Sequence, residues 1–257
     1  MKKDVLGIKI DDVNINQAVE VVFGWLKEGG RRYIVTPNPE IVVMAQKDQE
    51  LKNILNNADL VIPDGVGLKI ATDIVCNTPG IDLMEALIKL SNGKGFTTAF
   101  LGGKEGVAEK AAECLLRKYP NLKISFTGSG GEINENGELI GEDLRFKIYD
   151  LRDKNVHKSL IVNRKSLPKA DLLFIGFGPP KQEKWIAKNL NKLPVKIAMV
   201  VGGSLDYLSG QVPRAPKFIR SLGLEWLFRL IIQPWRIRRQ LALLKYLWLI
   251  WTMDGGK

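Results

Sequence analysis

The chain has 257 residues, of which 45% are hydrophobic and 26% are charged, values typical of a soluble globular protein rather than a disordered or collagen-like one. A chain of this length buries a sizeable core, so no disulfide or structural metal is needed to hold the fold. Its two cysteines, Cys76 and Cys114, exclude a zinc framework and a disulfide scaffold and fit a reducing compartment. The single histidine, His157, lies among charged residues, and we expect it to be a solvated surface side chain.

The formal net charge of +10 is concentrated in the last fifth of the chain. Residues 211–257 carry +7 of that charge and four of the six tryptophans, whereas residues 1–210 carry only +3. A concentrated charge indicates a partner, while a spread charge concerns solubility alone. We therefore expect a near-neutral body, residues 1–210, and a basic, Trp-rich helical appendage, residues 211–257, called the tail below.

Short apolar runs alternate with amphipathic segments through the first two-thirds of the chain, the pattern of strand–helix units in a mostly parallel sheet. In chain order, strands are predicted at residues 5–10, 33–36, 60–62, 98–101, 123–126, 172–175 and 197–201. Apolar residues at helical spacing predict helices that include residues 16–26 and 104–118. The predicted fold is α/β and Rossmann-like, a mostly parallel sheet flanked by helices.

Five of these strands are followed by a loop rich in Gly, Pro or Asn, in the order TPNP, PDGVG, GGKEG, GFGPP and GGS. Open α/β sheets bind ligands outside the carboxyl ends of their strands, so these loops should line one rim. None carries the dinucleotide-binding or P-loop fingerprint, and no DxD pair is present to hold a divalent metal on a sugar nucleotide. Residues 127–167 differ, because their polar, Gly/Asn-rich start predicts a hairpin or flexible excursion around residues 135–137, to which we assign no role.

Asp64 is the most suggestive carboxylate, because it follows a predicted strand and precedes Gly65-Val66-Gly67, whose backbone lets a substrate approach closely. At neutral pH an ordinary aspartate is an ionised acceptor that can act as a general base toward a hydroxyl. The alternative is that Asp64 only caps the helix that begins near Gly65, a role that aspartate favours. Both interpretations stay open on position alone.

Other polar residues stand at the ends of neighbouring strands. Thr36 and Asn38 flank a rigid proline in the TPNP loop, where they could hydrogen-bond a sugar or diphosphate, or serve only as turn and helix cap. Gln182 lies in a predicted first helical turn, where its amide could contact a base or ribose, or stay exposed. Asp206 places a carboxylate just after a strand and a double glycine.

The tail alternates apolar and basic residues between 224 and 253, so it lacks the uninterrupted apolar run of about 20 residues that spans a bilayer. Tryptophans mixed with Lys and Arg predict instead an interfacial helix on an anionic membrane. Pro234 should divide the segment into two helices. Arg236 and Arg239, spaced i and i+3, should share a face of the second helix and could clamp a diphosphate.

Seven segments together resemble the WecG/TagA/CpsF family of glycosyltransferases, in order and over most of the chain: TPNPEIVVMAQ, ADLVIPDGVGL, GIDLMEAL, FLGGKEGVAEKAAE, ADLLFIGFGPPKQEKWI, VGGSLDYLSGQVPRAP and LGLEWLFRLIIQPWRIRR. The resemblance implies a metal-independent, inverting enzyme without a cofactor. Such an enzyme transfers N-acetylmannosamine from its UDP donor to undecaprenyl-diphosphate-linked N-acetylglucosamine, which in the teichoic-acid branch forms the linkage unit of the wall polymer.

The same resemblance assigns roles to single residues. It implies that Asp64 is the general base, which favours that interpretation over the cap, and that Thr36, with Asn38 in its loop, lies beside the reacting sugar. It places Gln182 and Asp206 on the nucleotide side. It also implies that the tail folds over the site at the membrane, bringing three arginines to the substrate: Arg229, Arg236 and Arg239.

Two segments depart from the family pattern. Residues 74–80 are shorter than usual and lack an arginine expected before the Gly-x-Asp-Leu motif, and the region after Phe126 lacks a Gly-Tyr-Phe-like element. Both lie where substrate contacts are expected, so activity or sugar specificity could differ. A non-catalytic scaffold on the membrane surface therefore remains an alternative, beside a nucleic-acid-binding protein that uses the basic tail and an NAD-dependent enzyme.

The apolar residues between the tail arginines argue against nucleic acid as the partner, because nucleic acid gives such side chains no burial. The missing dinucleotide fingerprint argues against NAD. The first residues lead directly into a predicted strand without the apolar core of a signal peptide, so we expect no export. We expect a protein in the cytoplasm, peripheral on the inner face of the cell membrane, whose exposed tail could also support self-association.

Overall fold

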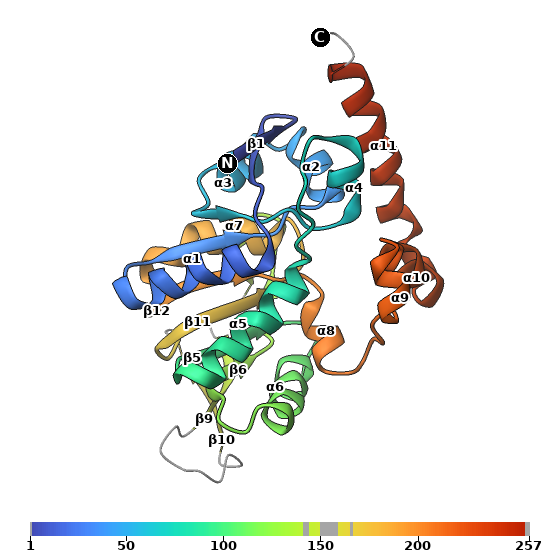
Figure 1. The fold of residues 1–257 in the computed structure, drawn as a ribbon. Coiled ribbons are helices and arrows are strands. Elements are labelled where there is room, and N and C mark those ends of the chain that lie inside the picture. The colour runs from blue at the N-terminus through green and yellow to red at the C-terminus, as the bar shows by residue number, and fades with distance from the viewer. Residues whose placement is uncertain (1, 141–143, 150–158, 165–166, 255–257) are drawn as a thin grey trace.

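The computed structural model describes residues 2–140, 144–149, 159–164 and 167–254 (Figure 1). Within these residues the central sheet has the strands β3 Arg32–Val35, β4 Leu60–Val61, β5 Thr97–Gly102, β6 Lys123–Gly128, β9 Leu144–Tyr149, β10 Ser159–Arg164, β11 Ala170–Gly176 and β12 Val195–Val200. The strand order across the sheet is β10-β9-β6-β5-β11-β12-β3-β4. The six strands from β6 to β4 pair in parallel, while β9 and β10 extend the sheet in antiparallel register.

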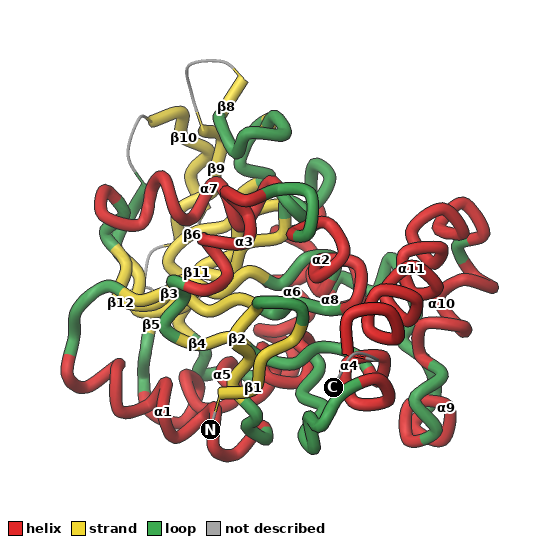
Figure 2. Tube along the Cα trace, turned by 90° about the horizontal axis from the view of Figure 1, so that it is seen from above, coloured by secondary structure: helices red, strands yellow, loops and turns green. Residues whose placement is uncertain are grey.

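Helices connect the strands and cover both faces of the sheet (Figure 2). The helices of the body are α1 Ile15–Glu28, α2 Pro39–Ala45, α3 Gln49–Asn56, α4 Val66–Ala71, α5 Gly80–Lys94, α6 Val107–Lys118, α7 Lys181–Asn189 and α8 Ser204–Leu208, with a 3-10 turn Leu190–Lys192. The helices of the tail are α9 Lys217–Ser221, α10 Glu225–Ile232 and α11 Ile237–Asp254, with a 3-10 turn Pro234–Arg236 before α11. The α/β, Rossmann-like fold predicted from the sequence is confirmed.

Successive residues of the central strands point to opposite faces and enter two separate cores. In β5, Ala99 and Leu101 join the core under α2, α3 and α7, whereas Phe100 joins the core under α1, α5 and α6. Phe100 stacks on Phe174 of β11 with ring centroids 5.6 Å apart. Burial on both faces explains why these strands read as continuous apolar runs rather than as alternating patterns.

The N-terminal segment corrects one prediction. Residues 5–10 do not form a single strand, because β1 Lys2–Val5 and β2 Ile8–Asp11 make an antiparallel hairpin outside the main sheet. Leu6 and Gly7 form its turn with positive φ angles of 54° and 81°, and the Gly7 N–H donates to the Asp4 carboxylate. The apolar run concealed a turn because only one of its two turn residues is a glycine.

The hairpin predicted around residues 135–137 is confirmed as β7 Glu132–Ile133 and β8 Leu139–Ile140, which pair in antiparallel register. The strands β9 and β10 account for part of the region to which the sequence assigned no role. His157 lies outside the described residues.

The tail ends in two helices separated at Pro234, as predicted. Helix α11 packs along α2 of the body, and its Tyr246 is completely buried in the core that α2 and α3 cover. Among the described residues no helix is both long and apolar enough to cross a membrane.

Candidate active site

A cavity of about 1190 Å³ opens at the carboxyl ends of the parallel strands, between the body and the tail. All five loops predicted to form one rim contribute to its wall, including Thr36, Asp64, Gly103, Phe177 and Gly202. The tail closes the opposite side with residues from α9, α10 and α11. A cavity in this position matches the rule that open α/β sheets bind ligands outside their strand ends, and its size suits a nucleotide sugar better than a single small ion.

Asp64 lies in the wall of this cavity, partly buried, directly after β4. It does not cap the following helix, because Gly65 occupies the cap position of α4 with no side-chain hydrogen bond, so the cap alternative is wrong. The pKa of Asp64 is raised to about 7, with burial as the main cause. The negative charges of Glu225 and Asp82 contribute to this rise, while a hydrogen bond from the Gly80 N–H and the charge of Arg214 oppose it. A carboxyl with a pKa near 7 is suited to general base catalysis at neutral pH.

The TPNP loop lies beside Asp64, since the Asp64 N–H donates to the Pro37 carbonyl oxygen at 3.1 Å. Thr36 is buried and its hydroxyl donates to the Val200 carbonyl oxygen at 3.3 Å, which ties β3 to β12 at the cavity floor. Asn38 caps α2, with its side-chain oxygen accepting the Ile41 N–H at 3.0 Å. Both residues also line the cavity, so turn and cap roles coexist with a position next to the substrate space.

Gln182 is almost completely buried and joins two of the rim loops. Its side-chain oxygen accepts the N–H groups of Gly178 at 3.2 Å and Gly202 at 3.1 Å, and its amide nitrogen donates to Glu183 at 2.9 Å. Because backbone N–H groups bond only to an acceptor, the amide orientation is fixed. The oxygen of Gln182 is therefore engaged within the protein, and the alternative of an exposed first turn is wrong at this residue.

Positive charge from the tail faces Asp206 across the cavity. Arg229 Nη2 lies 4.0 Å from Asp206 Oδ2, and its guanidinium stacks on the Tyr207 ring at 4.7 Å from the centroid. Burial raises the pKa of Asp206, while Arg229, Arg236 and Lys104 oppose that shift. The carboxylate and the cations thus share one partly desolvated space that can accept both hydroxyl groups and phosphates.

Arg236 and Arg239 lie in different environments although three residues separate them. Arg236 belongs to the 3-10 turn before α11, and its Nε is buried without a hydrogen-bond partner among the described residues. Burial and the charges of Arg229 and Arg239 lower the pKa of Arg236 to about 10, which still leaves it charged at neutral pH. Arg239 instead makes a two-pronged ion pair with Glu40 of α2, at 2.7 and 2.9 Å. Arg236 thus precedes α11 rather than lying in it, but both arginines line the same cavity, as their predicted common face requires.

Two features of the site were not predicted from the sequence. Arg214 bridges Asp82 and Glu225 next to Asp64. The β7–β8 hairpin, part of the region without an assigned role, contributes Glu132 and Ile133 to the cavity wall. Arg214 and Asp82 stand in the motifs VPRAP and GIDLMEAL, which the sequence analysis singled out. Nothing in the sequence indicated that these two motifs contact each other.

A comparison of the whole chain with known protein families identifies the family to which it belongs. The model of the glycosyl transferase WecG/TagA/CpsF family matches residues 3–254. The chain belongs to this family. The resemblance read from the seven segments is thereby confirmed, and the protein is a glycosyltransferase.

Relatives of this glycosyltransferase include proteins of Staphylococcus aureus strains MRSA252 and NCTC 8325. Each is 34% identical over 245 residues, which covers 93% of this chain and 87% of the relative. Both carry the name N-acetylglucosaminyldiphosphoundecaprenol N-acetyl-beta-D-mannosaminyltransferase.

Among the residues that the structure describes, no group of three or more His, Cys, Asp or Glu side chains is arranged to hold a metal ion. Basic side chains line the cavity of this glycosyltransferase, among them Lys104 and Lys181 of the body and arginines of the tail. Metal independence, implied by the family resemblance, stays a prediction.

Proposed function

We propose that this glycosyltransferase transfers N-acetylmannosamine from UDP-N-acetylmannosamine to undecaprenyl-diphosphate-linked N-acetylglucosamine at the inner membrane surface. The product would be the linkage unit of wall teichoic acid or of a related surface polysaccharide. The activity printed in the names of the Staphylococcus relatives supports this substrate pair. The observation that carries the proposal is a carboxylate with a raised pKa, Asp64, in the wall of a cavity that also contains Arg236, whose buried Nε has no hydrogen-bond partner among the described residues.

In the proposed reaction Asp64 removes the proton from the acceptor hydroxyl as the hydroxyl oxygen attacks the anomeric carbon of the donor. The new carbon–oxygen bond forms while the bond from the anomeric carbon to the diphosphate breaks, so that the configuration at that carbon inverts. The electron pair of the broken bond leaves with UDP. One base and one leaving-group site are sufficient for this single displacement.

In this reaction, arginines of the tail stabilise the negative charge that develops on the leaving UDP. Arg229 and Arg236 are the best candidates for its diphosphate, because their neighbouring charges and the buried Nε of Arg236 favour an anion between them. Arg239 can join them only by exchanging its ion pair with Glu40 for the substrate. These guanidinium groups would replace the metal ion that other glycosyltransferases place on the diphosphate, and no cofactor is needed.

The remaining site residues orient the donor. Thr36 and Asn38 stand in the loop next to Asp64 and line the cavity, which supports a role beside the transferred sugar. Asp206 can accept hydrogen bonds from ribose hydroxyls near the arginines. Gln182 acts on the nucleotide side chiefly by fixing the Gly178 and Gly202 loops, since its oxygen binds their N–H groups.

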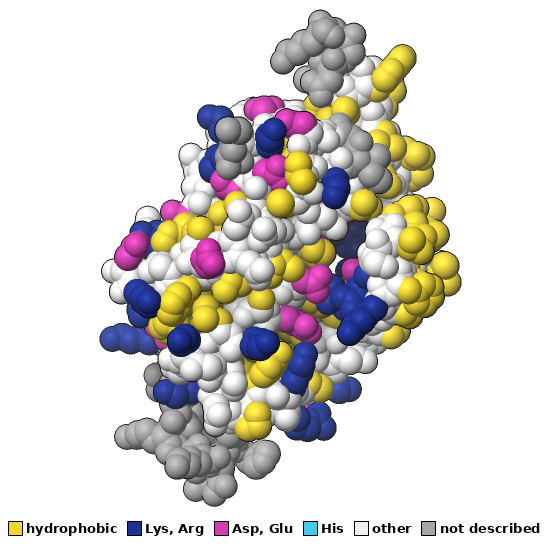
Figure 3. Space-filling model, viewed as in Figure 1, with side chains coloured by type: hydrophobic (Ala, Val, Ile, Leu, Met, Phe, Trp, Pro, Cys, Tyr) yellow, Lys and Arg dark blue, Asp and Glu magenta, His cyan; other side chains and the backbone are white. Residues whose placement is uncertain are grey.

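The outer surface of the tail suits an anionic membrane. Figure 3 shows apolar side chains gathered on the outer side of the tail helices, with Lys and Arg side chains where the tail meets the body. Trp235 and Trp251 are 72% and 77% exposed, and Ile231 and Leu244 are exposed beside them. Such a surface supports peripheral binding on the side of the membrane that presents the lipid acceptor.

The test measures UDP release from UDP-N-acetylmannosamine with a polyprenyl-diphosphate N-acetylglucosamine analogue. Without its base, Asp64→Asn should lose about two orders of magnitude or more in kcat. Arg236→Ala should lose on the order of a hundredfold, because the leaving diphosphate loses a buried donor. The matched control is Asp73→Asn, an exposed aspartate outside the cavity wall, which should keep normal turnover. Near-normal turnover in Asp64→Asn would contradict the assignment of the base.

A further inference from the structure

An ion-pair cluster joins the tail to the body close enough to Asp64 for its charges to act on that carboxyl group. Arg214, in the segment between α8 and α9, lies at its centre, with Nη1 2.5 Å from Asp82 Oδ1 and Nε 3.1 Å from Glu225 Oε1. Arg220 of α9 adds a second cation, 3.8 Å from Asp82. The side chains of all four residues are only 18–27% exposed, so solvent screens their charges incompletely.

The cluster and Asp64 are held by the same helix. Asp82 lies in the first turn of α5, and the Gly80 N–H at the start of α5 donates to the Asp64 carboxylate. Glu225 is the first residue of α10, so its charge reaches the site only through the tail. Asp64, Asp82, Glu225 and Arg220 all line the cavity.

The charges that face Asp64 act in opposite directions. Burial is the main cause of its raised pKa, Glu225 and Asp82 add to that rise, and Arg214 opposes it. Two carboxylates would therefore suppress ionisation of the base if Arg214 did not offset them. Glu40, the nearest carboxylate of α2, is already paired with Arg239.

The geometry also argues against a cluster that only adds stability. Arg214 Nη2 and Arg220 Nε are buried without a hydrogen-bond partner among the described residues. Buried donors without partners reduce stability, and such groups call for another explanation. A role in controlling the charge at the reacting carboxylate of Asp64 explains why such a cluster is kept.

We propose that Arg214 is a positioning residue that holds Glu225 of the tail and Asp82 of α5 beside Asp64 and offsets their negative charge there. This inference rests on the proposed role of Asp64 as the general base. Because Arg214 and Glu225 both belong to the tail, docking of the tail sets the proton affinity of the base as well as delivering arginines to the leaving group.

Two substitutions that break the same ion pair separate this proposal from a purely structural role. Arg214→Gln removes the positive charge and should move the titration of Asp64 to higher pH. Glu225→Gln removes a negative charge and should move it to lower pH. Each substitution should shift the titration of Asp64 by about half a pH unit or more, because each removes one unit charge that solvent screens only partly. A structural bridge would respond to both changes in the same direction.

The titration is measured on the full-length protein without substrate, by carbon-13 NMR of labelled aspartate carboxyls, with Asp64→Asn to assign the signal. The double variant Arg214→Gln/Glu225→Gln should titrate close to the wild type, and Arg214→Lys, which keeps the charge, should shift less than Arg214→Gln. Asp82→Asn gives a second route to the downward shift if Glu225→Gln fails to fold. Arg117→Gln, on the exposed face of α6, should leave the titration unchanged.

Shifts of Arg214→Gln and Glu225→Gln in the same direction, or no shift in Glu225→Gln and Asp82→Asn, overturn the proposal. Opposite shifts support it, and the acidic limb of kcat/KM for UDP release should then move with them. If the opposite shifts are found but the wild type releases no UDP from the proposed substrates, the proposed function fails while the role of Arg214 stands.

Discussion

The chemical role of Asp64 depends on its surroundings in the folded protein more than on its position in the sequence. The sequence placed an aspartate after a strand and before a glycine, and that pattern allowed a helix cap as readily as a base. In the structure Gly65 takes the cap position, and the carboxyl group accepts the Gly80 N–H inside the cavity. The pKa is raised to about 7 mainly by burial, and the negative charges of Asp82 in α5 and Glu225 in the tail contribute to the rise.

This pKa predicts that Asp64→Asn increases stability near neutral pH. An unfolded aspartate has a pKa of about 3.9, whereas the folded value is about 7. Between these values the folded protein keeps a proton that the unfolded chain releases, so the contribution of Asp64 to stability falls as the pH rises. Asparagine carries no proton to lose, and its oxygen can still accept the Gly80 N–H.

We expect Asp64→Asn to unfold with a free energy higher by on the order of 1–3 kcal/mol at about pH 8, and with no gain below about pH 4. Urea denaturation at several pH values measures both. Asp73→Asn, an exposed aspartate, should show no such pH-dependent gain. Equal stability of Asp64→Asn and the wild type at high pH would contradict a raised pKa of Asp64 in the folded protein.

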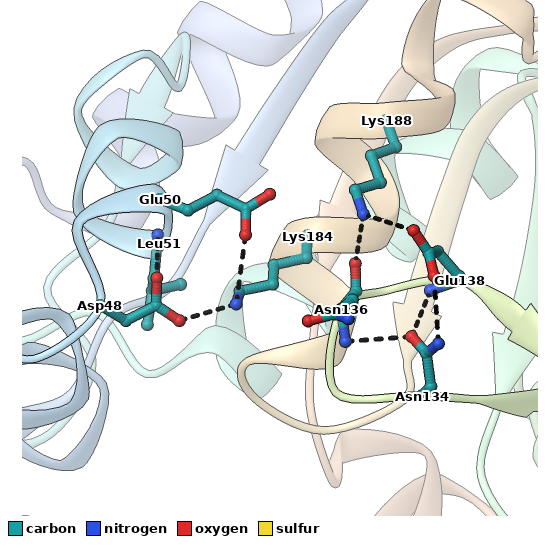
Figure 4. A network of polar contacts seen from close by, with 8 residues as sticks. All are labelled: Asp48, Glu50, Leu51, Asn134, Asn136, Glu138, Lys184 and Lys188. Carbon is teal, nitrogen blue, oxygen red and sulfur yellow. Dashed lines mark hydrogen bonds and ion pairs between the residues drawn. The ribbon is translucent and has the colours of Figure 1, made fainter.

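At the scale of elements, α7 is held from two sides (Figure 4). Lys184 pairs with Asp48 at 2.7 Å and Glu50 at 3.3 Å of the α3 region, and Lys188 donates to the Asn136 carbonyl oxygen at 2.7 Å in the β7–β8 hairpin. Helix α7 also carries Gln182, which fixes two rim loops. The hairpin that departs from the family pattern is therefore tied to the part of the site that should bind the nucleotide.

The β7–β8 hairpin packs closely against α7, so Gly137→Ala should lower the free energy of unfolding considerably. Gly137 has a φ of +75°, and a methyl group there would lie 2.5 Å from the Trp185 backbone nitrogen, which cannot move aside. Gly106 has a similar φ of +80° but no atom within 4 Å of such a methyl group. Gly106→Ala should cost only about 1 kcal/mol for its backbone conformation, whereas Gly137→Ala should cost clearly more.

Urea denaturation of both variants measures the difference. Equal losses of stability would show that the hairpin does not pack on α7 as described. Because the hairpin and Gln182 both border the cavity, Gly137→Ala should in addition raise KM for the UDP donor.

At the scale of the whole molecule, the tail presents two different surfaces. Its inner side contacts α2 and the cavity, with Tyr246 completely buried and Arg239 paired to Glu40. Its outer side leaves large apolar side chains such as Trp235 and Trp251 in solvent. A nucleic-acid partner would give those outer side chains no burial, whereas a membrane surface would.

We predict that Trp235→Ala/Trp251→Ala binds anionic phosphatidylglycerol vesicles roughly tenfold or more weakly than the wild type, because each tryptophan loses a large apolar contact. Sedimentation with vesicles measures the bound fraction. Val75→Ala, which removes a 68% exposed apolar side chain from the body, is the control and should bind normally. Removing residues 224–257 is a less specific test, since it also uncovers the core around Tyr246.

The sequence by itself determined the local features of this protein. Apolar periodicity identified the strands and helices of a parallel α/β fold, the glycine-rich loops predicted the rim, and Pro234 predicted the break in the tail. These features depend on near neighbours in the chain, so they could be predicted without a structure. The exceptions were the first hairpin, whose turn contains a leucine and so does not interrupt the apolar run, and the antiparallel strands β9 and β10, which lie where no strand was predicted.

The tertiary structure decided which charges meet. It buried the Gln182 oxygen against two loops, committed Arg239 to Glu40 while leaving the Arg236 Nε without a partner among the described residues, and placed Arg214 between Asp82 and Glu225. Apart from the bond between Gln182 and Gly178, these contacts join residues whose separation in sequence carries no periodic signal. Burial and long-range electrostatics exist only once the chain has folded, which is why the chemistry of the site could not be derived from the sequence alone.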